Sequence, residues 1–160
     1  MADWQGSART NYFRVVDMEG LQKALEPFDI DIKIHPEESE YVMLHPGFNS
    51  QDGGFEWSIV DDEDMDLEFQ FEEDVMPFVA EGEVVVMQEC GAEKLRYLTG
   101  FAQAYIRDGE NVDVVTIGLG GIYQLAAKQF GIDENEIARC SYDDLPASKD
   151  NQAQRPAPKG

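Results

Sequence analysis

The chain has 160 residues, of which 42% are hydrophobic, so a single domain with a real core is expected. Its 33 Asp and Glu residues against 12 Lys and Arg residues give a formal net charge of -21. A negative charge of this size repels DNA, RNA and anionic lipid and attracts basic protein surfaces or cations, which argues against direct nucleic-acid or membrane binding.

The termini and the apolar runs predict a protein of the cytoplasm. The longest apolar run, Val84 to Met87, is far too short to cross a bilayer, and Met1 to Trp4 contain no basic segment followed by an apolar one. We therefore expect neither a membrane span nor a signal peptide. Cys90 and Cys140 could pair, but a domain with an adequate core does not need a disulfide, and reduced, buried thiols are expected.

The first half of the chain reads mostly as strands. Asp17 is a good N-cap for a helix that Pro27 closes, and isoleucines alternate with polar residues after it. The expected elements are strands over 11–16, 30–34, 41–44 and 55–60 and a helix from Leu21.

The second half contains the strongest hairpin signal, Asp108-Gly109. The expected elements are an extended edge over 65–71, a short helix over 72–80, strands over 84–89, 96–107 and 111–117, a helix from Ile122 that stops at Gly131, and an edge strand over 137–142. These elements predict an α+β fold, a mostly antiparallel sheet with about three helices packed on one face. We expect one domain over 1–145 and a disordered tail over 146–160.

The acidic residues concentrate in one stretch. Between Lys33 and Lys94 lie eighteen Asp and Glu residues and no Lys or Arg, so this stretch carries -18 of the total charge. Same-face residues of an extended segment are ~6.7 Å apart, which would place the even positions 62–68 and 72 on one solvent face. A domain of this size is about 40 Å across, and duplex DNA of that length carries roughly 23 phosphate charges.

This comparison predicts a DNA mimic that is not an enzyme and that occupies the basic nucleic-acid-binding site of a host protein. The expected partner-binding residues are Asp61, Asp62, Glu63, Asp64, Asp66, Glu68, Glu72, Glu73 and Asp74. A solvated face that only keeps the protein soluble is the alternative interpretation of the same charges.

A calcium-binding module is a second alternative. Asp62, Asp64, Asp66 and Glu73 stand at positions 1, 3, 5 and 12 of an EF-hand-like loop, but Leu67 replaces the glycine that the sharp turn at position 6 needs. The apolar alternation around this loop favours a strand, so no metal site is predicted there.

A small enzyme is the third alternative, although no catalytic residue can be named. The glycine-rich segment over 116–121 lacks the lysine of a phosphate-binding loop, and the histidines and cysteines have no zinc-site spacing. No cofactor is therefore expected. Tyr97, Phe101 and Tyr105 recur every four residues and predict a core face or a dimer surface, which leaves a homodimer open.

Three segments, residues 8–17, 78–110 and 121–131, resemble an uncharacterised family of small acidic proteins associated with phages and plasmids. The resemblance implies no activity and no active-site residue. It implies a context, because accessory proteins of mobile elements often act on host defence and several unrelated families among them are acidic DNA mimics. By analogy, the target would be a restriction or CRISPR component.

Overall fold

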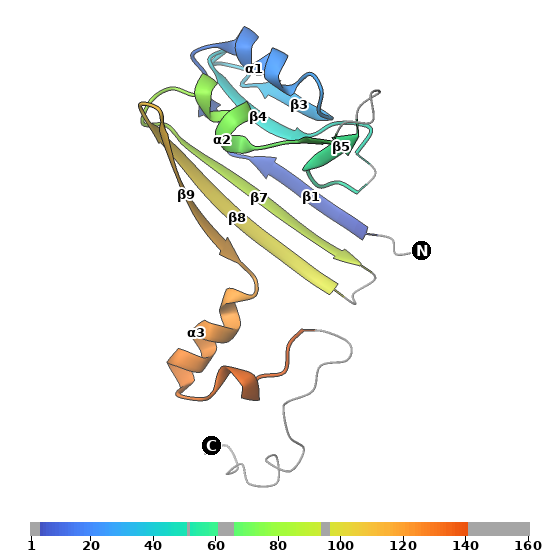
Figure 1. Cartoon of the computed structure of the whole chain (residues 1–160), viewed down its shortest axis with the longest axis vertical. Helices are drawn as coiled ribbons and strands as arrows, with labels where there is room; N and C mark the ends of the chain where they lie inside the picture. Colours follow the sequence, from blue (N-terminus) through green and yellow to red (C-terminus); the bar gives the residue numbers. More distant parts are fainter. Residues whose placement is uncertain (1–3, 51, 61–65, 94–96, 141–160) are drawn as a thin grey trace.

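The computed structural model describes residues 4–50, 52–60, 66–93 and 97–140. These residues form antiparallel sheets of four, three and two strands, together with three α-helices and two short 3-10 helices (Figure 1). The predicted α+β class with mostly antiparallel strands is confirmed. No helix in the described ranges has the length and hydropathy needed to cross a membrane.

The largest sheet has the strand order β1-β7-β8-β9. Its strands are β1 (Trp4–Thr10), β7 (Val84–Glu93), β8 (Tyr97–Asp108) and β9 (Asn111–Gly118). The last three form a meander, and the predicted hairpin is confirmed because Asp108 pairs with Asn111 and Gly109 adopts a φ of 62°. Strand β1 was not predicted, and it pairs along the free edge of β7.

The second sheet begins at Phe13, shortly after β1 ends at Thr10. It has the order β2-β4-β3, with β2 (Phe13–Arg14), β3 (Ile30–Ile34) and β4 (Tyr41–Pro46). The buried hydroxyl of Thr10 joins the two sheets, because its Oγ1 accepts a hydrogen bond from the backbone N–H of Leu44 at 2.9 Å and donates one to the Asn11 carbonyl. A small hairpin of β5 (Ser58–Val60) and β6 (Asp66–Glu68) lies beside these sheets.

The helices of the first half of the domain cover the core. Helix α1 (Met18–Leu25) begins at Asp17, whose carboxylate accepts from the N–H of Gly20 at 2.9 Å, as predicted for an N-cap. Helix α2 (Phe71–Asp74) leads into the 3-10 helix η1 (Met76–Phe78), and α1 contacts both. The fully buried side chains come from both larger sheets and from these helices: Phe13, Leu21, Val42, Leu44, Phe71, Val75, Met76, Val79, Val85 and Met87.

The third helix does not pack on the sheet. Helix α3 (Gly121–Phe130) ends at Gly131 as predicted, but none of its side chains is buried, and it projects past the end of the large sheet (Figure 1). The expected edge strand over 137–142 is wrong for residues 137–140, which follow the 3-10 helix η2 (Glu134–Glu136) without a strand; residues 141 and 142 lie outside the described ranges. The predicted tail also lies outside them.

Candidate functional site

Backbone segments from separate parts of the chain come together at one end of the molecule, at the upper left of Figure 1, and each of them carries exposed acids. The segments that meet there are the start of α1, the β3–β4 turn, α2, the turn before β7 and the β8–β9 hairpin. We call this surface the acidic end, and we define it by its exposed acids: Asp17, Glu19, Glu37, Glu38, Glu40, Glu72, Glu73, Glu81, Asp108, Glu110 and Asp113.

Backbone hydrogen bonds hold these segments together. The N–H of Val15 donates to the carbonyl of Glu40 at 2.8 Å, and the N–H of Val16 donates to the carbonyl of Phe78 at 2.9 Å. The N–H of Gly82 donates to the carbonyl of Arg107 at 3.2 Å, which joins the turn before β7 to the β8–β9 hairpin. The carboxylates of the acidic end are therefore carried by a connected framework.

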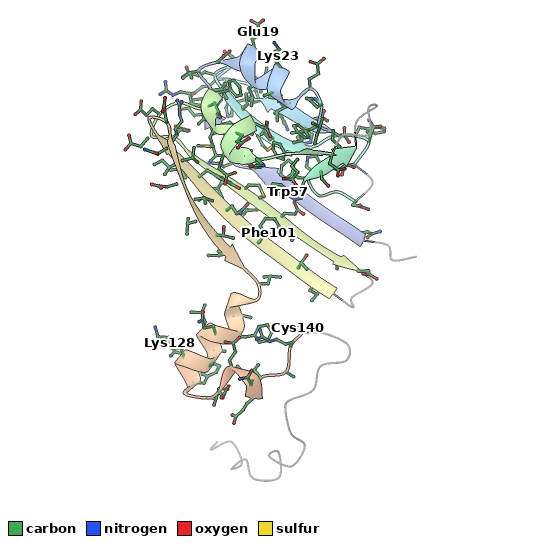
Figure 2. All side chains as sticks on the ribbon, in the orientation of Figure 1. Glu19, Lys23, Trp57, Phe101, Lys128 and Cys140 are labelled. Carbon is green, nitrogen blue, oxygen red and sulfur yellow. The ribbon has the colours of Figure 1, made fainter. Side chains whose placement is uncertain are left out.

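Few positive charges compensate this surface. The guanidinium of Arg107 donates to two main-chain carbonyls, those of Val79 at 2.8 Å and Pro77 at 3.4 Å. Within the described part of the chain, the one ion pair joins Arg139 to Glu134 at 2.6 Å, and both belong to the segment after β9. Of the two lysines labelled in Figure 2, Lys23 of α1 lies at the same end of the molecule as Glu19, whereas Lys128 lies at the other end, near Cys140. The acidic end thus keeps most of its negative charge.

The structure divides the predicted partner-binding residues. Asp61, Asp62, Glu63 and Asp64 lie outside the described ranges. Asp66 and Glu68 are exposed on β6, on either side of the half-buried Leu67, as the predicted alternation requires. They belong to the β5–β6 hairpin, whereas Glu72 and Glu73 are exposed on α2 and belong to the acidic end.

Asp74, one of the predicted partner-binding residues, has a structural role. It is half-buried, and its Oδ2 accepts a hydrogen bond from the N–H of Gln70 at 2.8 Å, just before α2 begins. Glu83 is also half-buried, and its Oε1 accepts from the N–H of Arg14 at 3.2 Å. These two carboxylates therefore stabilise the framework under the exposed acids.

Sequence reasoning missed the members of the acidic end that come from distant parts of the chain. Asp108, Glu110 and Asp113 lie beyond the lysine- and arginine-free stretch, and Asp17 and Glu19 precede it. The hairpin signal at Asp108-Gly109 could have indicated an exposed acidic turn. Its position beside η1 follows only from the tertiary structure.

Both cysteines lie in the described part of the chain, and so do some of the candidate metal ligands. Cys90 and Cys140 are free thiols, but both are exposed, so the expectation that they are buried is wrong. Cys90 is exposed because the face of β7 opposite the core is uncovered. No group of three or more His, Cys, Asp or Glu side chains that could hold a metal ion occurs among the described residues. Asp62 and Asp64 of the EF-hand-like loop lie outside that part of the chain.

A second candidate site is a polar pocket of about 640 Å³ between the β5–β6 hairpin and β7. Glu89 lines this pocket, and its Oε2 accepts a hydrogen bond from the N–H of Phe55 at 3.3 Å. Burial raises the pKa of Glu89, and hydrogen bonds from the Phe55 N–H and the Trp57 side chain partly offset this effect. A Cβ at Gly54 would come within 2.9 Å of the Glu89 carboxylate, so a larger residue there would require this carboxylate to shift.

Aromatic rings form the wall between this pocket and the core. Trp57 lies 6.0 Å from Phe55 and 6.3 Å from Phe101 between ring centroids (Figure 2). Phe101 and the buried Tyr105 face this inner side of the sheet, which confirms the predicted core face for these two residues. A half-buried carboxyl group with a raised pKa can donate a proton or bind a cationic group.

Comparison with family models, with curated proteins and with solved structures finds no match to this chain. The resemblance to small acidic phage and plasmid proteins therefore stays a prediction. The functional proposals rest on the charges and contacts of the described residues.

Proposed function

We propose that this protein is a non-enzymatic inhibitor that acts in the cytoplasm. It presents its carboxylates, as phosphate substitutes, to the basic nucleic-acid-binding site of a host protein. The supporting observation is the acidic end, where exposed carboxylates from five segments share one framework and form no ion pair within the described residues. By analogy with acidic mimics of mobile elements, the target is a restriction or CRISPR component.

Repulsion among the carboxylates of the acidic end favours the binding of a basic partner. Gathering unpaired carboxylates on one surface weakens the folded state, and a basic partner relieves this cost when it binds. The exposed acids of β6, Asp66 and Glu68, add to the negative charge that the described residues present. A partner that normally binds a phosphate backbone carries the complementary row of Lys and Arg side chains.

The first experiment is a pull-down from host lysate with the tagged protein at low salt, followed by competition with duplex DNA. We expect the tagged protein to capture a DNA- or RNA-binding protein. Added duplex should release it by competing with the carboxylates for the basic site, and salt should release it by screening the charges of both proteins. A captured partner that continues to bind DNA in the complex would contradict the proposal. So would the capture of no nucleic-acid-binding protein.

Two variants with the same change in net charge locate the binding surface. One changes Glu73→Gln, Asp108→Asn and Asp113→Asn in the acidic end, and the other changes the exposed residues Glu26→Gln, Asp31→Asn and Asp52→Asn outside it. If each lost contact costs roughly 0.5–1 kcal/mol, the first variant should bind the partner about tenfold or more weakly. Equal weakening in both variants would show that net charge, not the acidic end, determines binding.

A small-molecule site at Glu89 is the second candidate function, favoured by the polar pocket and the raised pKa of this carboxyl group. A library of small amines and hydroxyl compounds can be screened by the shift in melting temperature. A ligand of this pocket should stabilise the wild type and not Glu89→Gln. Ligands that stabilise both proteins equally would place their site elsewhere.

A further inference from the structure

The outer face of the four-stranded sheet carries many exposed apolar side chains, and nothing among the described residues covers it. Val85, Met87 and Tyr105 point into the core, so the alternating residues of β7 and β8 point to the opposite face. There, Ala102 pairs with Ile117, and Ile117 is 71% exposed. The face carries the exposed hydrophobic side chains Val84, Ile106, Val115, Ile117 and Leu119.

A groove of about 490 Å³ crosses this face. Its floor is made of small residues, Gly100 and Ala102 of β8. Its lining also includes Arg9, Gln88 and Cys90 from β1 and β7, and Ile117 and Leu119 on the β9 side. Small residues in the centre of a sheet leave room for the side chains of a second element. A groove of this kind fits one apolar helix face.

Helix α3 carries a matching apolar side. Its other side is covered by the segment that follows, because the Tyr123 hydroxyl accepts from the N–H of Cys140 at 2.6 Å and the Arg139 guanidinium lies 4.2 Å from the Tyr123 ring centroid. The uncovered side includes Ile122 and Leu125, which are 59% and 64% exposed.

The charge distribution indicates what can cover these two surfaces. From Val114 to Ile132 the chain has no Asp or Glu, and Lys128 is its one charged residue there. The Glu89 side chain, beside the groove in sequence, turns to the inner face and bonds to Phe55. Two copies with a charge of -21 each would repel one another at the acidic end, but not through this acid-free region.

We propose that two copies of this chain form a symmetric dimer in which α3 of each copy lies in the outer-face groove of the other. Only Leu119 and Gly120 separate β9 from α3, and the Leu119 N–H is bonded to the Gly100 carbonyl at 2.9 Å. This short connection directs α3 past the end of its own sheet (Figure 1). A reciprocal exchange doubles the buried area, which helps to reach the roughly 1,200–2,000 Å² of a stable interface.

Solution mass is the first test. Light scattering with size exclusion should give twice the chain mass of 18.0 kDa for the wild type. Leu125→Glu places a carboxylate in the apolar interface and should give a monomer, whereas Gln124→Glu, on the opposite side of α3, should stay dimeric with the same net charge as Leu125→Glu. A monomeric wild type, or a dimer that survives Leu125→Glu, overturns the proposal.

Salt separates this interface from the proposed inhibitory function. The dimer should tighten or stay unchanged as salt rises, because screening reduces repulsion between the two acidic copies, whereas capture of a basic partner should weaken. A dimer that dissociates at high salt contradicts the apolar interface. Failure to capture a partner leaves the dimer prediction unaffected, since the mass measurement involves no partner.

Disulfide trapping tests the position of the helix. In a Cys140→Ser background, Leu125→Cys faces the groove that holds the native Cys90, and mild oxidation should produce a covalent dimer. Gln124→Cys is the matched control and should cross-link far more slowly. A disulfide within one chain would show that α3 covers its own sheet, and no cross-link at all would place α3 outside the groove; either result overturns the proposal.

Discussion

Phe71 stacks on Tyr105, with ring centroids 5.1 Å apart and an interplanar angle of 15°. This contact joins the first residue of α2 to the C-terminal part of β8. It also brings Glu72, the next residue, close enough to Tyr105 to affect the pKa of its hydroxyl. The acidic end is therefore anchored in the core through an aromatic pair.

Phe71→Ala should destabilise the domain strongly. Phe71 is 1% exposed and contacts Phe55, Trp57, Phe69 and Tyr105, so its removal leaves a cavity worth about 3–5 kcal/mol of unfolding free energy. Urea unfolding measures this loss. Phe48→Ala is the control, because Phe48 is 98% exposed and its removal should change stability by less than about 0.5 kcal/mol.

Tyr105 should titrate above its unfolded value of 10.0. Burial, with a smaller contribution from Glu72, raises the pKa of Tyr105 to about 12. Because the folded-state pKa is raised, the stability that this group contributes is complete below the unfolded value of 10.0 and is lost as the pH rises toward about 12. Ultraviolet titration should show a tyrosine with a midpoint near 12, and Glu72→Gln should lower that midpoint. A midpoint near 10.0 in the folded wild type would contradict the buried environment.

Glu89→Gln should change how stability depends on pH. Because burial raises the pKa of Glu89, its contribution to stability is complete below the unfolded value of 4.5 and is lost as the pH rises through the folded-state pKa. The variant lacks this ionisation. We expect its melting temperature relative to the wild type to increase between about pH 4 and about pH 7. A constant difference across that range would show that Glu89 titrates normally.

Gly109→Ala should weaken the β8–β9 hairpin. Gly109 has a φ of 62°, a backbone conformation that costs alanine about 1 kcal/mol. Gly120→Ala is the comparison, because Gly120 has a φ of -60° and nothing lies within 4 Å of an added Cβ. Thermal unfolding should show a loss for the first change and no loss for the second. Equal losses would mean that the turn geometry does not limit stability.

Local patterns predicted much of the fold. The Asp17 cap, the alternating isoleucines of β3, the Asp108-Gly109 hairpin and the stop of α3 at Gly131 are all confirmed. Each depends on neighbouring residues alone, because caps, turns and alternation are set by local backbone geometry. The final strand over 137–140 was wrong because a short apolar run does not distinguish a strand from a coil.

Pairing between distant segments was the part that local patterns could not supply. Strand β1 carries polar and small residues that do not read as a strand, and it is one because β7 offers a free edge for hydrogen bonding. The expected packing of α3 on the sheet also differed, since an apolar helix face does not say which surface will cover it.

The amino-acid sequence by itself determined the excess of negative charge, the α+β class and the absence of acids from residues 114–132. The tertiary structure alone decided that the acids of 17–19, 37–40 and 108–113 join those of α2 at one end, and that the outer face of the sheet remains open. The physical reason is that composition fixes the total charge, whereas strand pairing and core packing between distant segments fix where each charge lies.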